Sequence, residues 1–457
     1  MSDRGAAIED PPAVSSYGRS AAGLTAALGL GGLLTYVFFI LTSHGLTEDQ
    51  YGEVVVLWSV VFIVASTLYR PIEQLLARTL AERDQVGAPS GDALRTAGVI
   101  QAGVCLLTVV GLLIFRGPLQ DNLFSNDPDF FWAMLVSLVG FSLAYFARGF
   151  LAGRGHFGVY AALLMVESML RVVFAVLLTV GIFDGPASIA VAIALAPFCG
   201  VLMVPFARRG GARPPAAGTI PGGGDLTLGR GSAFAGAVLV MMLSEQILVS
   251  SGALFVRAAD GAAAAGFMFN ILLVARAPLV LFQAVAASLL PHLTRLRARA
   301  DREGDDAFHE SLQNTMLLIV GFAAATTVGV LAIGPQVMQI AFGDGFDYDR
   351  IGLAIVAVGM GFYLVAASLN QAALAQGQAH RAAYRWILCA GLFIVYNLIG
   401  PGDPFRTVEV GYAGCSALLA LLLYAVYRRP VARPDDLFEP GSPEEVQARL
   451  ATSDEIA

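Results

Sequence analysis

Lysine is absent from the 457-residue sequence, so all 28 basic residues are arginines. A Walker A loop needs a lysine on the nucleotide phosphates, and a Schiff-base enzyme needs a lysine amine. Both kinds of site are therefore excluded, and neither a nucleotide nor a nucleic acid is expected as a partner. Charge of either sign is also scarce, since 14% of the residues are charged, against about 25% in soluble globular domains.

Cysteine and histidine show no metal-binding pattern. The four cysteines all lie within apolar runs, where a cysteine behaves as a small buried hydrophobe. The five histidines are scattered without a metal-ligand spacing. The longest expected outer connection, residues 334–350, is too short for a catalytic domain, and its acidic residues are expected to be a solvated cap. We therefore expect no catalytic residue, metal or cofactor, and a protein that is not an enzyme.

Apolar residues are in excess, at 56% of the chain. A membrane-spanning helix takes about 20 apolar residues, so a dozen spans would use close to half of the sequence. We predict an all-α polytopic membrane protein with about 12 transmembrane helices. The expected spans are residues 20–43, 52–70, 96–115, 130–150, 157–182, 186–206, 231–255, 263–290, 312–333, 351–374, 383–400 and 408–427.

A proline- and glycine-rich segment divides these spans into two groups of six. Short motifs recur in both groups, such as GRGH at 153–156 and GQAH at 377–380, which predicts two parallel six-helix repeats around a central cavity. Substrates of transporters built from repeats bind between the halves. The predicted organisation is a disordered cytoplasmic leader (1–19), an N-terminal lobe (20–207), a cytoplasmic linker (208–229), a C-terminal lobe (230–428) and an acidic cytoplasmic tail (429–457).

The arginines predict the orientation, because positive residues concentrate on the cytoplasmic side of a membrane protein. With both termini in the cytoplasm, only four arginines fall outside, namely Arg116, Arg257, Arg350 and Arg406. We therefore predict a multi-pass protein of the bacterial inner membrane with both termini cytoplasmic.

Charged residues within the spans are the first candidates for a binding site. An ionised side chain at the centre of a membrane helix costs about 2.5–3.5 kcal/mol, so it usually faces a cavity or a partner. Glu167 and Arg171 are one helical turn apart, and can either neutralise each other or line the central cavity. Glu245 and Arg276 have no local opposite charge, so each needs water, a ligand or another helix, and they can pair with each other.

Three amides complete the candidate set. Asn270, Asn370 and Gln371 can either bind sugar hydroxyls or bridge helices. Arg148 and Arg154 are interpreted as ordinary cytoplasmic-side arginines rather than ligands. The candidate substrate-binding residues are therefore Arg276, Glu245, Arg171, Glu167, Asn270, Asn370 and Gln371.

Three segments (41–59, 145–172 and 269–296) resemble the multidrug/oligosaccharidyl-lipid/polysaccharide (MOP) exporter superfamily, in particular its polysaccharide-biosynthesis, Wzx-like branch. The resemblance implies two six-helix lobes in a V around a central cavity. Arg276, in VARAPL, matches a cavity arginine of related cell-wall precursor flippases. The first span has no arginine between Ser20 and Ser43, which departs from that pattern and speaks against the peptidoglycan precursor as substrate.

The resemblance implies a flippase that translocates a polyprenyl-pyrophosphate-linked oligosaccharide by alternating access for cell-surface polysaccharide biosynthesis. Its expected partners are that lipid-linked substrate, the bilayer, and a polysaccharide polymerase or glycosyltransferases of the same pathway. The alternative is a cation-coupled, multidrug-type small-molecule exporter of the same superfamily. Such an exporter would use a titratable carboxylate in the first or seventh span, where Glu245 is the only candidate.

Overall fold

The computed structural model describes residues 12–85, 89–209, 228–276, 306–343, 345–346, 348–376, 378–400 and 402–428, and these ranges contain helices without a strand. Within them, ten helices are long and apolar enough to cross a membrane, or eleven if the bent pair α9 and α10 is one span. The prediction of an all-α polytopic membrane protein is confirmed.

The helices follow the expected order along the chain. The N-terminal half consists of α1 (Pro12–Gly45), α2 (Glu48–Leu68), α3 (Arg70–Gln85), α4 (Gly91–Ile114), α5 (Arg116–Leu123), α6 (Pro128–Gly153), α7 (Phe157–Thr179), α8 (Gly185–Val201) and the 3-10 helix η1 (Val204–Arg209). The C-terminal half consists of α9 (Leu228–Ser250), α10 (Gly252–Asp260), a helix at Ala262–Arg276, α12 (Asp306–Phe342), α13 (Arg350–Ala375), α14 (Ala379–Ile399) and α15 (Pro404–Tyr427).

Several boundaries differ from the expected ones. Helix α1 begins at Pro12, inside the segment that was expected to be disordered. The second span continues past residue 70 as α3, giving one apolar stretch at Glu48–Asp84. The seventh span is broken by a bend of 50° between α9 and α10. The linker at 210–227, the tail from 429 and the second part of the eighth span lie outside the described residues.

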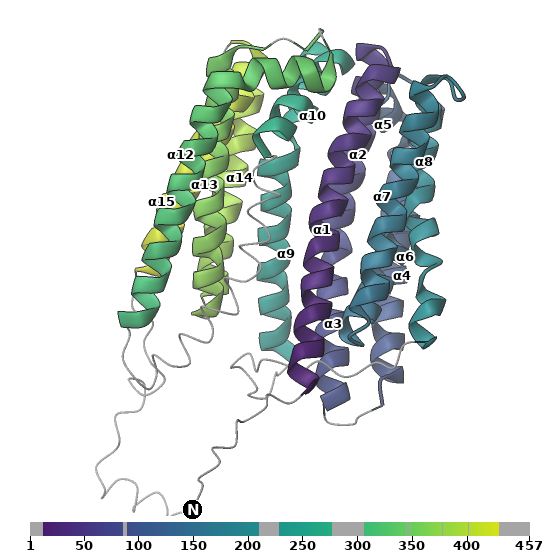
Figure 1. Cartoon of the computed structure of the whole chain (residues 1–457), viewed down its shortest axis with the longest axis vertical. Helices are drawn as coiled ribbons and strands as arrows, with labels where there is room; N and C mark the ends of the chain where they lie inside the picture. The colour runs from purple at the N-terminus through teal and green to yellow at the C-terminus, as the bar shows by residue number, and fades with distance from the viewer. Residues whose placement is uncertain are drawn as a thin grey trace, which may run out of the picture.

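The helices pack as two bundles that meet along α2 and α9 (Figure 1). In the N-terminal half α1 packs on α7, and α6 packs on both α3 and α8. In the C-terminal half α13 packs on α12 and α15, while α14 packs on α9 and α15. Below, the "α1–α2 end" means the end at which α1 passes into α2, at the top of Figure 1.

The outer surface of the bundles carries many exposed large apolar side chains. Ile340, Leu107 and Ile399 are 81%, 74% and 74% exposed, and only 11% of the most apolar stretch of α4 is buried within the protein. Soluble monomers rarely expose apolar surface on this scale. The exposed side chains are therefore matched to lipid, and the helices satisfy their backbone polar groups internally, as a bilayer requires.

Candidate functional site

A buried ion pair lies at the centre of the N-terminal half. The Arg148 Nη2 atom of α6 lies 2.5 Å from the Glu167 Oε2 atom of α7. Arg148 also lies over the ring of Tyr145, 4.8 Å from its centroid. Glu167 is 2% exposed, and removing one partner of such a pair leaves an uncompensated buried charge. Arg148, interpreted from sequence as an ordinary cytoplasmic-side residue, is therefore part of the membrane-embedded core.

Arg171 has no carboxylate partner among the described residues, which differs from the pairing with Glu167 that its spacing allows. Its guanidinium lies over the ring of Trp58 in α2, 4.9 Å from the centroid, and donates to the Ser168 hydroxyl at 3.3 Å. Its Nε atom is buried without a partner. Because Glu167 turns toward α6 instead, the cation on α7 is left with an aromatic face and one hydroxyl.

The polar contacts of this half continue to the end opposite the α1–α2 end. The Tyr160 hydroxyl donates to Glu73 in α3 at 2.7 Å, and Arg154 pairs with Asp84 at 3.1 Å. Burial and the neighbouring charge of Arg154 lower the pKa of His156, which lies between α6 and α7. These contacts tie α3 to the α6–α7 turn.

In the C-terminal half, Glu245 of α9 accepts a hydrogen bond of 2.5 Å from the Tyr363 hydroxyl of α13. The Tyr363 ring packs edge-on against Trp386, and Trp386 donates to the Asn370 amide oxygen at 3.0 Å. Asn370 therefore bridges α13 and α14, one of the two roles expected of it. Gln371, the next residue, is exposed on α13.

Arg276 is the last described residue of the helix Ala262–Arg276, and its buried Nε and Nη2 atoms have no hydrogen-bond partner among the described residues. Tyr36, Tyr363 and Tyr412 lie near its guanidinium. Glu245 forms no ion pair with Arg276 in the part of the chain that the structure describes. Arg276 thus combines a positive charge with unused donors.

Asn270 lies where the two halves meet. Its amide oxygen accepts a hydrogen bond of 2.5 Å from the Tyr51 hydroxyl of α2. Asn270 is 0% exposed, and its Nδ2 atom has no partner among the described residues. Three of the seven candidates, Glu245, Asn270 and Arg276, therefore lie on helices that contact the N-terminal half. Glu167 and Arg171 lie on α7, which packs on α1 and α8, whereas Asn370 and Gln371 lie on α13.

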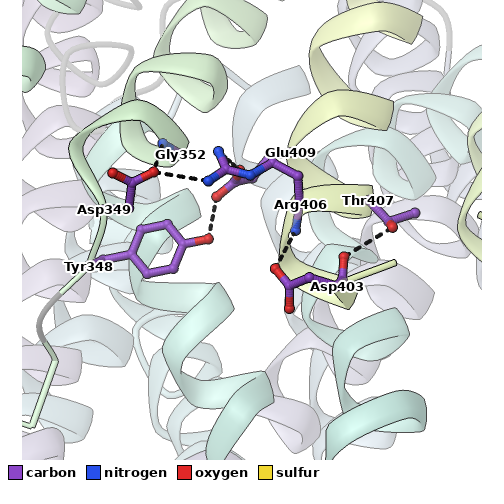
Figure 2. A network of polar contacts seen from close by, with 7 residues as sticks. All are labelled: Tyr348, Asp349, Gly352, Asp403, Arg406, Thr407 and Glu409. Atoms are coloured by element: carbon purple, nitrogen blue, oxygen red, sulfur yellow. Dashed lines mark hydrogen bonds and ion pairs between the residues drawn. The ribbon is translucent and has the colours of Figure 1, made fainter. Parts of the chain in front are cut away.

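A second polar network lies in the C-terminal half at the α1–α2 end (Figure 2). Arg406 of α15 lies 2.9 Å from Asp349 and 3.0 Å from Glu409, and the Tyr348 hydroxyl donates to Glu409. The hydrogen bond from Arg406 lowers the pKa of Asp349, and burial raises that of Tyr348. Sequence analysis did not select Glu409, which is 0% exposed. Its position as an acidic residue inside the last expected span was the signal that could have identified it.

This network includes one of the acids of the connection before α13. Asp349, expected to belong to a solvated cap, is 47% exposed, and in addition it caps α13 by accepting from the Gly352 amide at 3.2 Å and pairs with Arg406. A surface pocket of about 610 Å³ adjoins Tyr348 and Asp349. Asp344 and Asp347 lie outside the described residues.

The three-dimensional arrangement matches solved structures of membrane transporters. An inward-facing multidrug resistance MATE family transporter of the MOP superfamily has a TM-score of 0.65 and 13% identity, covering 90% of this chain and 100% of that one. A point mutant of the MATE transporter VcmN of Vibrio cholerae has a TM-score of 0.61 and 16% sequence identity, covering 91% of this chain and 97% of that one. The eukaryotic MATE transporter AtDTX14 has a TM-score of 0.62 and 14% identity, covering 93% of this chain and 97% of that one.

This chain has the MATE fold. No family model matches the sequence, and no curated protein matches it. The MOP superfamily, expected from three sequence segments, is the superfamily of the structural neighbours, whereas the Wzx-like branch is not confirmed. At these identities the likeness shows the fold, with its two bundles, and carries no residue role across.

Proposed function

We propose that this chain is a membrane exporter that moves a small organic molecule between its two halves by alternating access, coupled to a cation that binds at Glu245. The MATE fold over about nine-tenths of the chain supports this proposal. The observation that carries it is an acidic side chain on α9, the helix along which the two halves meet, that forms no ion pair with any described residue.

The contacts of Glu245 suit a coupling role. An ionised carboxylate in a membrane helix is costly unless it is compensated, and here the compensation is a hydrogen bond from Tyr363 and the nearby positive charge of Arg70 in α3. Binding of a proton or a sodium ion would neutralise the carboxylate, which removes that cost and weakens the hydrogen bond from the Tyr363 hydroxyl. Because Tyr363 belongs to α13, the state of Glu245 would bias the packing of α9 against the rest of the C-terminal half.

Glu245→Gln tests this proposal, because it keeps the shape of the side chain and removes the charge. In proteoliposomes with an imposed proton or sodium gradient, we expect gradient-driven export of a small organic substrate to fall by about tenfold or more, the range of a coupling worth about 1.4 kcal/mol or above. Glu82→Gln, in an exposed ion pair with Arg78, is the matched control. Equal transport by Glu245→Gln and the parent under every gradient would refute the coupling role.

A second candidate function is supported by Arg276. A buried guanidinium with two unused donors suits a phosphate, which arginine binds with paired hydrogen bonds. On this proposal the chain is a flippase for a polyprenyl-pyrophosphate-linked oligosaccharide, and the partners are that lipid-linked substrate and the polymerase or glycosyltransferases of its pathway. Arg276, together with Arg171, would hold the phosphates while the polyprenyl tail remains in the lipid.

The two candidates differ in what a deletion strain loses. If the chain is a flippase, surface polysaccharide disappears on deletion, returns with Arg276→Lys in part, and does not return with Arg276→Ala. If it is a small-molecule exporter, drug susceptibility and efflux change while surface polysaccharide stays intact. Normal surface polysaccharide in the Arg276→Ala strain would refute the phosphate-binding role of Arg276.

The arginine distribution supports a location in the bacterial inner membrane with both termini in the cytoplasm. On this placement the α1–α2 end faces outward, since the four arginines at that end, Arg116, Arg257, Arg350 and Arg406, are the outer ones.

A further inference from the structure

The pocket of about 610 Å³ beside Tyr348 lies between the last turns of α12 and the first turn of α13. Pro335, Gln336 and Gln339 line it from α12, and residues 348–351 line it from the connection into α13. Its volume is within the range of small-ligand sites, about 300–1,000 Å³. The pocket borders the network of Figure 2, with which it shares Tyr348 and Asp349.

The surface around this pocket faces lipid. Only 11% of the most apolar stretch of α12 is buried within the protein, and Ile340 and Ile351, next to the polar lining residues, are 81% and 63% exposed. Side chains of this kind are matched to a bilayer rather than to water. The pocket is therefore reached from the membrane side of the C-terminal half.

The height of the pocket is that of the lipid head groups. Helix α13 has 26 residues and is thus about 39 Å long, longer than the hydrocarbon core of about 30 Å. The pocket lies where α12 ends and α13 begins. Polar lining residues at this level meet the charged part of a lipid, while the exposed apolar residues of α12 nearer the membrane centre meet its acyl chains.

Several polar groups of the pocket are left without a protein partner. Arg350 is exposed and forms no ion pair in the part of the chain that the structure describes. The side chains of Gln336 and Gln339 likewise have no hydrogen bond to a described residue. Asp349 pairs with Arg406, yet 47% of its side chain is exposed. The pocket thus presents a cation, a carboxylate and two amides side by side.

We propose that this pocket binds a phospholipid whose head group carries both a phosphodiester and a primary ammonium, as in phosphatidylethanolamine. Arg350 binds the phosphate through charge-assisted hydrogen bonds, and the exposed side of Asp349 accepts from the ammonium. Gln336 and Gln339 donate to the phosphate and ester oxygens, and the acyl chains lie along α12. The site is on the lipid-facing side of one half, so the proposal does not depend on what the chain transports.

The charges of the pocket distinguish this lipid from two others. Phosphatidylglycerol brings a phosphate without a cation, so its negative charge would lie beside Asp349 uncompensated. Phosphatidylcholine brings a quaternary ammonium, which cannot donate a hydrogen bond to a carboxylate. Both should therefore bind more weakly than phosphatidylethanolamine.

Native mass spectrometry of the delipidated full chain in detergent tests the proposal. The three lipids, with identical acyl chains, are added at equal concentration. We expect the first bound lipid to be phosphatidylethanolamine by about fivefold over either competitor, a difference of about 1 kcal/mol. Arg350→Gln should lower phosphatidylethanolamine binding by about fivefold, and its melting temperature should equal that of the parent, because Arg350 has no ion-pair partner to lose.

Arg116→Gln is the matched control. It removes the same charge at the same end of the molecule, but in the N-terminal half, where Arg116 lies over the ring of Trp132 at 5.2 Å from its centroid. Its lipid binding should equal that of the parent. A photoactivatable phosphatidylethanolamine locates the site independently: it should label residues 333–351 in the parent and in Arg116→Gln, and about fivefold less in Arg350→Gln.

Equal binding of the three lipids by the parent would overturn the proposal, as would a loss in Arg116→Gln as large as that in Arg350→Gln. Labelling that is confined to other helices would also overturn it. A preference for phosphatidylglycerol would refute the role of Asp349 and with it the assignment of an ammonium head group.

Discussion

At the scale of single residues, the buried arginines differ in what compensates their charge. Arg148 has a carboxylate, Arg171 has an indole ring and one hydroxyl, and Arg276 has two buried donor atoms that form no hydrogen bond with a described residue. A guanidinium that is already paired contributes to the packing of its lobe, whereas one with free donors can bind a ligand. As candidates for substrate binding, the arginines therefore rank Arg276 first, Arg171 second and Arg148 last.

Arg148→Ala should destabilise the protein by about 3–5 kcal/mol, because it leaves Glu167 buried without a partner. The double variant Arg148→Ala/Glu167→Ala should recover part of this loss, which unfolding in detergent with a double-mutant cycle measures. Arg78→Ala, in the exposed pair with Glu82, should cost about 0.2–1 kcal/mol. A loss for Arg148→Ala no larger than that of Arg78→Ala would contradict the buried pair.

The lowered pKa of His156 predicts a pH dependence with a definite sign. Below the ordinary pKa of about 6.5, the unfolded chain binds a proton on this histidine that the folded protein binds less readily, so stability falls as pH is lowered. His156→Gln should remove this component, and melting temperatures between pH 5 and pH 8 would show a smaller decline. An unchanged pH profile would mean that His156 does not contribute.

At the scale of elements, several helices begin with an aspartate or threonine that caps the first turn. Thr47 and Gln50 form a reciprocal capping box at α2, and Asp127, Asp349 and Asp403 each accept a backbone amide bond at α6, α13 and α15. Such caps satisfy backbone amides that have no partner inside the helix. They fix the positions at which the chain enters the membrane-spanning region.

Asp403→Ala should destabilise the C-terminal half by about 0.5–2 kcal/mol through loss of the cap on α15. Asp349→Ala should cost at least as much, since Arg406 also loses one of its two carboxylate partners. Asp184→Ala is the control, because Asp184 precedes α8 without a capping hydrogen bond. Chemical unfolding followed by circular dichroism measures the three values; an equal loss for Asp184→Ala would exclude the capping explanation.

At the scale of the whole molecule, two bundles of membrane helices meet along α2 and α9 and close at the α1–α2 end. The large helix contacts lie within each half, so the two halves can move relative to each other while those contacts are kept. A carrier needs such a division, since its halves must move as bodies without unfolding.

The orientation of the molecule is tested with reporter fusions. Green fluorescent protein joined after Arg209 should fluoresce, because this connection is predicted to lie in the cytoplasm. Alkaline phosphatase joined after Ile182 or Gly343 should be active, because these two connections are predicted to lie on the outer side of the membrane. The reverse pattern would place the α1–α2 end on the cytoplasmic side.

The sequence predicted the class of the fold because hydropathy and the shortage of charge are summed over hundreds of residues. It placed most helices within a few residues, and missed the extension of the second span into α3 and the bend after α9, because packing rather than hydropathy decides where an apolar helix breaks. Among the site residues, Glu245 was expected to need a partner from another helix, water or a ligand, and the structure places the Tyr363 hydroxyl of α13 against it; the binding roles of Glu245 and Arg276 stay predictions.

Partners distant in the chain were beyond the sequence. Glu167 has two arginines within reach, one four residues away and one 19 residues away, and only the approach of α6 to α7 decides that Arg148 is the closer. Composition and hydropathy alone determined that this protein is a helical membrane protein. The tertiary structure decided which charges are neutralised, which donors stay free and where the two halves meet, because these depend on distances between helices that no periodicity records.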